Sequence, residues 1–486
     1  MKKRILSIAT GLLVFLGACD FSDFGDTNVS PTALPAVSNK ALLTFSEQAI
    51  SWTTWNAPAR QGAVGTASST GGYANDYMAL YAQYLSEGPY PESQNYSDRN
   101  LSWTEWYRGP LANLQAIIDN NNAGNAAADP ANGSKNNQIA VARILKAYYF
   151  WYLTDTYGDI PYFEALKGVE VAKPKYDAQQ AIYNDLFKEM TEAQAQIEMA
   201  GFPVQGDILL NGDMAAWKRF ANTARMFMAL RLIDRDQAKA KSEFEAAMTA
   251  GAITSNAENI EYQFLGGDPN NWNPWYENYT NDNRNDYALS NTIVDNMQGD
   301  PRLAVYGESI NGKIIGLPYG TNVARNIPAA YSRLSERFQG ADAVAPIFTY
   351  SQVLFARAEM ANRGVTSENA GDLYEQGIAA SAAFYGVPNT IPHGTYAGNN
   401  AAGLEQIITQ KWKHQFLNGF EAWTDWRRTG FPSFLLPGPG TLDAKGIPLR
   451  MSYPANARTV NEAGFDAAIA RQGPDTNYTR VWWDVK

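Results

Sequence analysis

Apolar residues recur at three- and four-residue intervals over long stretches of this chain, and this spacing constrains the fold more than any other feature. Within residues 138–157, Ala142, Leu145 and Tyr149 keep this spacing. Because an α-helix turns once every 3.6 residues, these side chains lie on one helical face. The pattern therefore predicts a helix that ends near Gly158.

The same reasoning predicts a mainly α fold. Strand-like alternation is scarce, and residues 313–317 are the clearest short example. Consecutive helices of similar length, such as 178–197 followed by 214–232, predict a tetratricopeptide-like scaffold of helical hairpins, with an unrelated packed helical array as the alternative. The other predicted helices cover residues 101–121, 177–199, 213–233, 237–251, 350–363, 368–385 and 404–420.

The first nineteen residues have the features of a bacterial lipoprotein signal. Three basic residues precede an apolar run over residues 5–16, and Leu16-Gly-Ala-Cys19 ends it with the only cysteine of the chain. The run is too short for a permanent membrane span. We therefore expect a signal peptide over residues 1–18, acylation of Cys19, a lipidated acidic tether over 19–39 and one domain over 40–486. The alternative is an ordinary cleaved signal with an incidental Cys19.

The charge of the chain argues against two classes of partner. Loss of Lys2, Lys3 and Arg4 with the signal changes the formal net charge from -10 to -13. An acidic surface is repelled by nucleic acid and by anionic headgroups, so we expect no nucleic-acid partner. The lipid alone would then hold the protein at its membrane.

Two loop-rich insertions, near residues 58–100 and 255–345, hold the candidate binding residues. Residues 266–286 contain seven asparagines around four large rings, Trp272, Trp275, Tyr276 and Tyr279. Rings among amide and carboxylate groups suit a carbohydrate, whose C–H face packs on a ring while its hydroxyls bond to polar groups. The alternative is that these rings pin a long loop to the helical scaffold.

Further candidates lie near the first insertion. Tyr90 and Tyr96 stand in a Pro/Asn/Ser loop where no helical period requires them, and Trp55 lies beside a glycine-rich stretch. In contrast, Tyr73, Tyr77, Tyr81 and Tyr84 follow a helical rhythm, which favours packing in the core.

The residues do not form a recognisable catalytic or cofactor-binding pattern. The chain has two histidines, His393 and His414, and lacks metal-ligand spacing and phosphate-binding glycine loops. Asp282-Asn-Arg-Asn-Asp286 resembles a calcium loop faintly but lacks its glycine turn and distal glutamate. We expect no enzyme activity and no cofactor, although paired carboxylates of a glycosidase cannot be recognised in a sequence.

Several motifs resemble those of the SusD/RagB family of outer-membrane nutrient-binding lipoproteins. They are Asn28-Val-Ser-Pro31, Asp155-Thr-Tyr-Gly-Asp-Ile-Pro161, Gly299-Asp-Pro-Arg302, the helix from Leu354 to Glu359, and a long match from Lys411 to Pro432 that includes Glu421-Ala-Trp-Thr-Asp-Trp-Arg-Arg-Thr-Gly430. From their residue types, we interpret the motifs at 155–161 and 423–432 as structural, joining the scaffold helices.

The resemblance implies a tetratricopeptide-like scaffold with an irregular ligand-binding half and no catalysis. It also implies a cell-surface position on the outer membrane, a glycan or oligosaccharide ligand, and a SusC-like TonB-dependent transporter as partner. The family's sugar-contacting rings come from two loop regions, which correspond here to Tyr90 and Tyr96 and to the cluster of Trp272, Trp275, Tyr276 and Tyr279. The alternatives are a lipid-anchored glycosidase, a peptidase or a peptide-binding protein.

Overall fold

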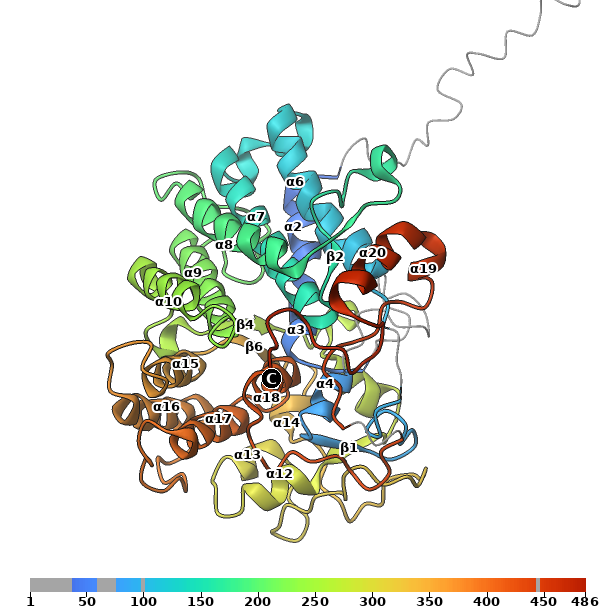
Figure 1. The fold of residues 1–486 in the computed structure, drawn as a ribbon, viewed down its shortest axis with the longest axis vertical. Helices are drawn as coiled ribbons and strands as arrows, with labels where there is room; N and C mark the ends of the chain where they lie inside the picture. The colour runs from blue at the N-terminus through green and yellow to red at the C-terminus, as the bar shows by residue number, and fades with distance from the viewer. Residues whose placement is uncertain (1–36, 59–75, 98–100, 443–445) are drawn as a thin grey trace, which may run out of the picture. The chain divides into compact units, whose positions relative to one another are not determined.

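The computed structural model describes residues 37–58, 76–97, 101–442 and 446–486. Residues Ser38–Lys486 form one compact unit. The predicted signal peptide, Cys19 and most of the tether lie outside the described residues. The Ser38–Lys486 unit is mainly helical, with three two-stranded sheets among the described residues (Figure 1).

Six helices pack in a series in which each contacts the next. They are α2 (Asn39–Gln48), α6 (Ala112–Ala123), α7 (Lys135–Tyr157), α8 (Gln179–Gln196), α9 (Met214–Arg231) and α10 (Gln237–Gly251). Side chains cap several of these helices; for example, Ser134 and Asp213 accept backbone N–H bonds at the first turns of α7 and α9. This stacked arrangement confirms the predicted tetratricopeptide-like scaffold.

A second helical group consists of α15 (Tyr350–Asn362), α16 (Ala370–Tyr385) and α17 (Ala401–His414), and α15 also contacts α9. Thr349 and Gln352 form a capping box at the start of α15. Gly377 lets α16 approach closely, because a Cβ there would lie 2.7 Å from the Phe355 ring. The helices α15 and α16 therefore form a closely packed pair.

The predicted single helix over residues 404–420 is wrong. The chain breaks after α17, where Leu417 has a φ of +66°, and α18 (Gly419–Thr429) starts with Asn418 as its N-cap. Gly419 packs on the backbone of Met78, where a Cβ would lie 2.3 Å from the Met78 carbonyl oxygen. A close contact with a distant segment thus ends one helix and begins another.

The predicted helix at 101–121 and the strand-like reading of 313–317 also need correction. The former is divided into α5 (Thr104–Trp106), the π-helical η2 (Tyr107–Leu111) and α6, because Pro110 interrupts the hydrogen-bond ladder. In the latter, Lys313 and Leu317 form only isolated bridges. Sequence reasoning missed α20 (Glu462–Gln472).

Two of the three sheets join segments that are far apart in sequence, and the third joins neighbouring segments. They are β1 (Leu85–Glu87) with β5 (Tyr287–Leu289), β2 (Ile160–Pro161) with β3 (Tyr176–Asp177), and β4 (Ile260–Gln263) with β6 (Val344–Phe348), all antiparallel. Ile260 pairs with Phe348, and Gln263 pairs with Val344. Residues 264–343 therefore leave the scaffold and return to it at the same place.

The remaining elements are short. They are α3 (Ser51–Thr54), α4 (Asp76–Tyr81), η3 (Ala126–Ala128), η4 (Pro130–Asn132), η5 (Gly168–Val171), η6 (Asn256–Glu258), η7 (Pro269–Asn271), α11 (Pro274–Tyr276), η8 (Glu277–Asn281), α12 (Asn291–Asn296), α13 (Leu303–Tyr306), α14 (Glu336–Gln339) and α19 (Ala457–Val460). Tyr81 and Tyr84 are buried, as predicted, whereas Tyr73 lies outside the described residues.

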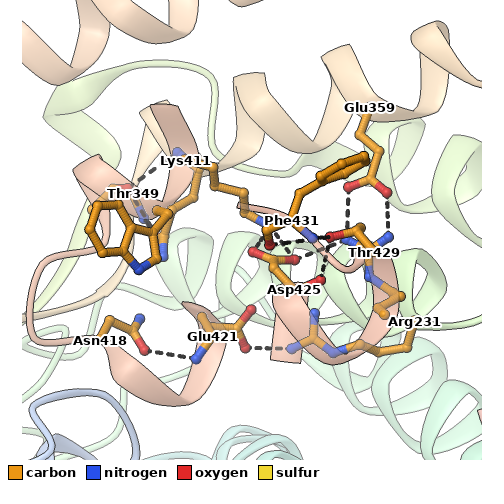
Figure 2. Close-up of polar contacts among 12 residues, drawn as sticks. Arg231, Thr349, Glu359, Lys411, Asn418, Glu421, Asp425, Thr429 and Phe431 are labelled. Atoms are coloured by element: carbon orange, nitrogen blue, oxygen red, sulfur yellow. Dashed lines mark hydrogen bonds and ion pairs between the residues drawn. The ribbon is translucent and has the colours of Figure 1, made fainter. Parts of the chain in front are cut away.

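A buried ionic network joins α18 to the scaffold helices (Figure 2). Arg231 contacts Asp155 at 3.2 Å and Glu421 at 2.6 Å. Lys411 lies 2.8 Å from Asp425, and Arg428 contacts both Asp425 and Glu359.

These partners control the charge of the buried carboxylates. Burial alone raises the pKa of Glu359, but Arg428 and Arg363 outweigh it and lower the pKa below its usual value. Burial also raises the pKa of Asp425, and Lys411 and Arg428 reverse the effect. The motif residues from Lys411 to Thr429 therefore hold helices together in the interior, which agrees with their predicted structural role.

Candidate functional site

The β1–β5 pair brings the two predicted binding loops together. Leu85 pairs with Leu289 and Glu87 with Tyr287, and beyond the strand the Gly88 N–H donates to the Asp286 carbonyl over 2.9 Å. The loop that carries Tyr90 therefore begins beside the end of the 266–286 loop. A short sheet thus connects segments almost 200 residues apart in sequence.

Tyr90 and Arg284 form a direct contact across this junction. Arg284 Nη2 donates to Tyr90 Oη over 3.2 Å, and the guanidinium carbon lies 5.6 Å from the ring centre. Asp286 accepts from Arg284 Nε over 2.7 Å. Burial lowers the pKa of Arg284, but Asp286 outweighs this effect and raises it. With 49% of its surface exposed, Tyr90 still presents much of its ring to solvent.

Trp272, Tyr276 and Tyr279 are half-buried. The rings of Trp272 and Tyr276 meet edge to face, with centres 5.2 Å apart, and Trp272 Nε1 donates to the Gly266 carbonyl over 2.8 Å. Tyr279 lies in the π-helical turn η8 and lines a small hollow of about 20 Å³ together with Arg284, Asp286 and Arg333. The partly exposed rings therefore stand beside guanidinium, carboxylate and amide groups.

Three predicted ligand residues are core residues instead. Trp55 and Trp275 are each 2% exposed, and Tyr96 is 3% exposed. Trp55 Nε1 donates to Asn273 Oδ1 over 2.7 Å, and Trp275 Nε1 donates to the Trp55 carbonyl over 3.3 Å. A ring without exposed faces cannot stack on a ligand in this conformation. These two tryptophans attach the loop to the scaffold, which was the alternative considered from the sequence.

Tyr96 has a comparable anchoring position. Its hydroxyl lies 3.2 Å from that of Tyr319, which also donates to the Leu80 carbonyl over 2.8 Å. Burial raises the pKa of Tyr96 to about 12. Tyr96 therefore fixes its loop against residues 318–327.

Two further loops border the loop that carries Tyr90; residues 318–327 belong to the predicted insertion near 255–345, whereas sequence reasoning missed residues 434–442. From the 318–327 loop, the Arg325 N–H donates to the Gly88 carbonyl over 3.1 Å. From the 434–442 loop, the Leu442 N–H donates to the Asn95 carbonyl over 3.1 Å. Gly320 and Gly438 allow these loops to touch, because a Cβ on Gly320 would lie 2.5 Å from Gly438 Cα. These loops expose Val323, Leu436 and Leu442. No periodic pattern in the sequence marks these three side chains.

The two histidines have structural environments. His414 is buried, with Nε2 at 2.7 Å from Thr349 Oγ1 and Nδ1 at 2.9 Å from Ser381 Oγ, and burial lowers its pKa. His393 contacts Glu375 at 3.0 Å. Among the residues that the structure describes, no cluster of three or more His, Cys, Asp or Glu could hold a metal ion. A search of the same residues finds no helix with the length and apolarity of a membrane span.

Comparisons with known proteins agree on one family. The family model described as SusD-like, starch-binding associating with outer membrane, matches residues 45–454. The structure of a chitin-binding protein has 27% identity and a TM-score of 0.76, covering 92% of this chain and 100% of that one. No curated protein matches the chain by sequence.

More distant structures share the same fold. A chitin-binding SusD homolog from Flavobacterium johnsoniae has 23% identity and a TM-score of 0.73, covering 92% of this chain and 99% of that one. A SusD homolog from Bacteroides fragilis has 23% identity and a TM-score of 0.75, with coverage of 93% and 100%.

Proposed function

We propose, because this chain belongs to the SusD-like family of starch-binding proteins that associate with the outer membrane, that it captures a glycan at the cell surface and delivers it to a transporter. Tyr90, Trp272, Tyr276 and Tyr279 contact the glycan. The chain acts as a binding protein without catalysing a reaction. Acylated Cys19 anchors it in the outer membrane, and a SusC-like TonB-dependent transporter receives the ligand.

The contact between Arg284 and Tyr90 is the observation that carries this proposal. It joins the two loops while about half of the Tyr90 surface remains exposed. A guanidinium that stacks on one ring and pairs with Asp286 holds both groups in place before a ligand arrives. Such preorganisation reduces the entropic cost of binding.

The chemistry around these rings fits a neutral, hydroxylated ligand. Ring faces pack on the C–H face of a sugar, and the side chains of Asn278, Arg284 and Asp286 supply donors and acceptors for its hydroxyls. Because the ion pair neutralises both Arg284 and Asp286, the site does not require a charged ligand.

Two oligosaccharide classes are the first probes. A structurally similar protein with 27% identity is named as chitin-binding, and the family description names starch. We therefore expect the full chain in mild detergent to bind the N-acetylglucosamine hexamer or maltoheptaose in titration calorimetry. Absence of binding to both at about 10 mM would contradict glycan capture in these two classes, since a site that weak has almost no free energy to offer.

The transporter partnership is tested separately. Affinity purification of the tagged chain from outer membranes, under several mild detergents, should recover a large β-barrel protein in a fixed ratio. A permanent pair is expected to bury well over ~1,000 Å². Recovery of the chain alone under every detergent would contradict a permanent pair and would leave the calorimetric test of glycan binding unaffected.

A further inference from the structure

A large groove lies on the helical scaffold. It has a volume of about 480 Å³ and is formed by α6, α7, α8 and the 162–170 segment. Its size lies within the ~300–1,000 Å³ typical of small-molecule sites. In Figure 1 these three helices lie at the opposite end of the Ser38–Lys486 unit from β1 and α12. The groove is therefore separate from the aromatic loops.

Lys146 supplies hydrogen-bond donors to this groove. Its ammonium donates to Gln115 Oε1 over 2.9 Å, and Gln115 is its only hydrogen-bond partner among the described residues. An ammonium carries three donors, so two remain for a ligand. Burial lowers the pKa of Lys146, because the nearby carboxylates compensate only in part for the hydration that its ammonium has lost.

Acceptors and an open ring complete the lining. Asp119 accepts from Gln115 over 2.9 Å, and Asp185 accepts from the Tyr162 hydroxyl over 2.8 Å, which leaves each carboxylate with further lone pairs. Phe163 is 47% exposed, and its ring meets Tyr162 edge to face at 4.9 Å. The adjoining Leu166, which also lines the groove, has a left-handed φ of +65°.

The charges of the groove are almost balanced. Arg143 pairs with Glu189 through two bonds of 2.9 and 3.0 Å, which neutralises that carboxylate. The other charged side chains of the lining are three carboxylates, Asp119, Asp185 and Glu170, and two ammonium groups, Lys146 and Lys167. Mixed donors and acceptors beside an exposed ring suit a polyhydroxylated molecule better than a strongly charged one.

We propose that this groove is a second saccharide-binding site, in which Phe163 stacks on a sugar ring while Lys146, Asp119 and Asp185 bond to its hydroxyls. This inference rests on the proposed glycan-binding function. A chain with two separated sites can hold one long glycan at two points or bind two short ones, and the gain from simultaneous contact depends on the span between the sites.

Titration calorimetry of the full chain with the N-acetylglucosamine hexamer and maltoheptaose tests the proposal. We expect two binding events for the wild type. The double variant Tyr90→Ala, Tyr276→Ala should retain the groove event. Lys146→Met or Phe163→Ala, each made alone and on that double variant, should weaken the groove event by about tenfold or more. Phe202→Ala, which removes a 53% exposed ring outside the groove, is the matched control and should change neither event.

The outcomes separate this inference from the proposed function. A single event that the loop variant abolishes and the groove variants leave unchanged would overturn the second site and support the first. A single event lost only in the groove variants would support the groove and contradict the loop site. Absence of any binding event with both oligosaccharides would overturn both sites. Binding of spermidine in the groove, without binding of either sugar there, would overturn the proposed ligand class.

Discussion

Arg284 Nη2 donates a hydrogen bond to Tyr90 Oη over 3.2 Å, and this contact joins the two loops that the sequence marks as rich in aromatic rings. The first prediction concerns this pair. Arg284→Met keeps the aliphatic stem but removes the guanidinium, so we expect about tenfold weaker oligosaccharide binding in calorimetry because Tyr90 loses its support.

The same substitution should hardly change the melting temperature, because partly exposed ion pairs contribute only about 0–1 kcal/mol. Arg458→Met, at an exposed arginine of α19, is the matched control and should bind normally. Normal affinity of the Arg284 variant would mean that Tyr90 does not depend on this contact.

The second prediction concerns the buried network of Figure 2. Arg428→Met leaves Glu359 and Asp425 buried with fewer partners, so the free energy of unfolding should fall by ~3–5 kcal/mol. Denaturant unfolding measures this loss, and Arg458→Met again serves as the control. A loss below ~1 kcal/mol would show that Lys411 and Arg363 suffice for these carboxylates.

The third prediction concerns Glu47 on α2. Burial, followed by the negative charge of Asp207, raises the pKa of Glu47 well above its usual value. A group with a raised folded-state pKa contributes stability below its unfolded pKa of about 4.3 and loses that contribution as the pH rises through the folded-state value. Glu47→Gln keeps the acceptor for the Ile208 N–H and cannot ionise.

We therefore expect the Glu47→Gln variant to gain melting temperature relative to the wild type as the pH increases from 5 toward 8. Measurement of both proteins across this range checks the sign. A constant difference between their melting temperatures would mean that the folded protein does not hold the pKa of Glu47 above its unfolded value.

The fourth prediction concerns the anchor. Cys19→Ser should leave the fold unchanged, because the sequence has no second cysteine for a disulfide, and should release the protein from membranes of cells that lack the transporter. Fractionation followed by immunoblotting measures the distribution. Continued sedimentation of the variant with outer membranes would contradict lipidation at Cys19.

The sequence was sufficient to predict the helical scaffold because its helices are long and their apolar spacing is regular. It did not predict the division between α17 and α18, since the cause is the contact of Gly419 with the backbone of Met78, a segment more than 300 residues away. Periodicity reports local structure and carries no information on such contacts.

The candidate site was predictable only by region. Loop composition identified Tyr90 and the 266–286 cluster, but it could not distinguish exposed Tyr90 from buried Trp55 and Trp275, because burial depends on which segments cover a ring. The junction itself rests on strands of three residues each, β1 and β5, which are too short to show alternation. The sequence did not indicate the groove beside Lys146, because its lining combines three helices with the 162–170 segment and no local pattern reports how these elements pack together.

The central claim is that exposed loop rings bind the glycan while buried ones support the fold. Its most direct test measures oligosaccharide affinity and melting temperature on the same variants. Tyr90→Ala and Tyr276→Ala should each weaken binding by ~1 kcal/mol or more with little change in melting temperature. Trp55→Ala, the matched buried ring, should lose ~3–5 kcal/mol of stability. A large drop in melting temperature with unchanged affinity for Tyr90→Ala and Tyr276→Ala would contradict the account.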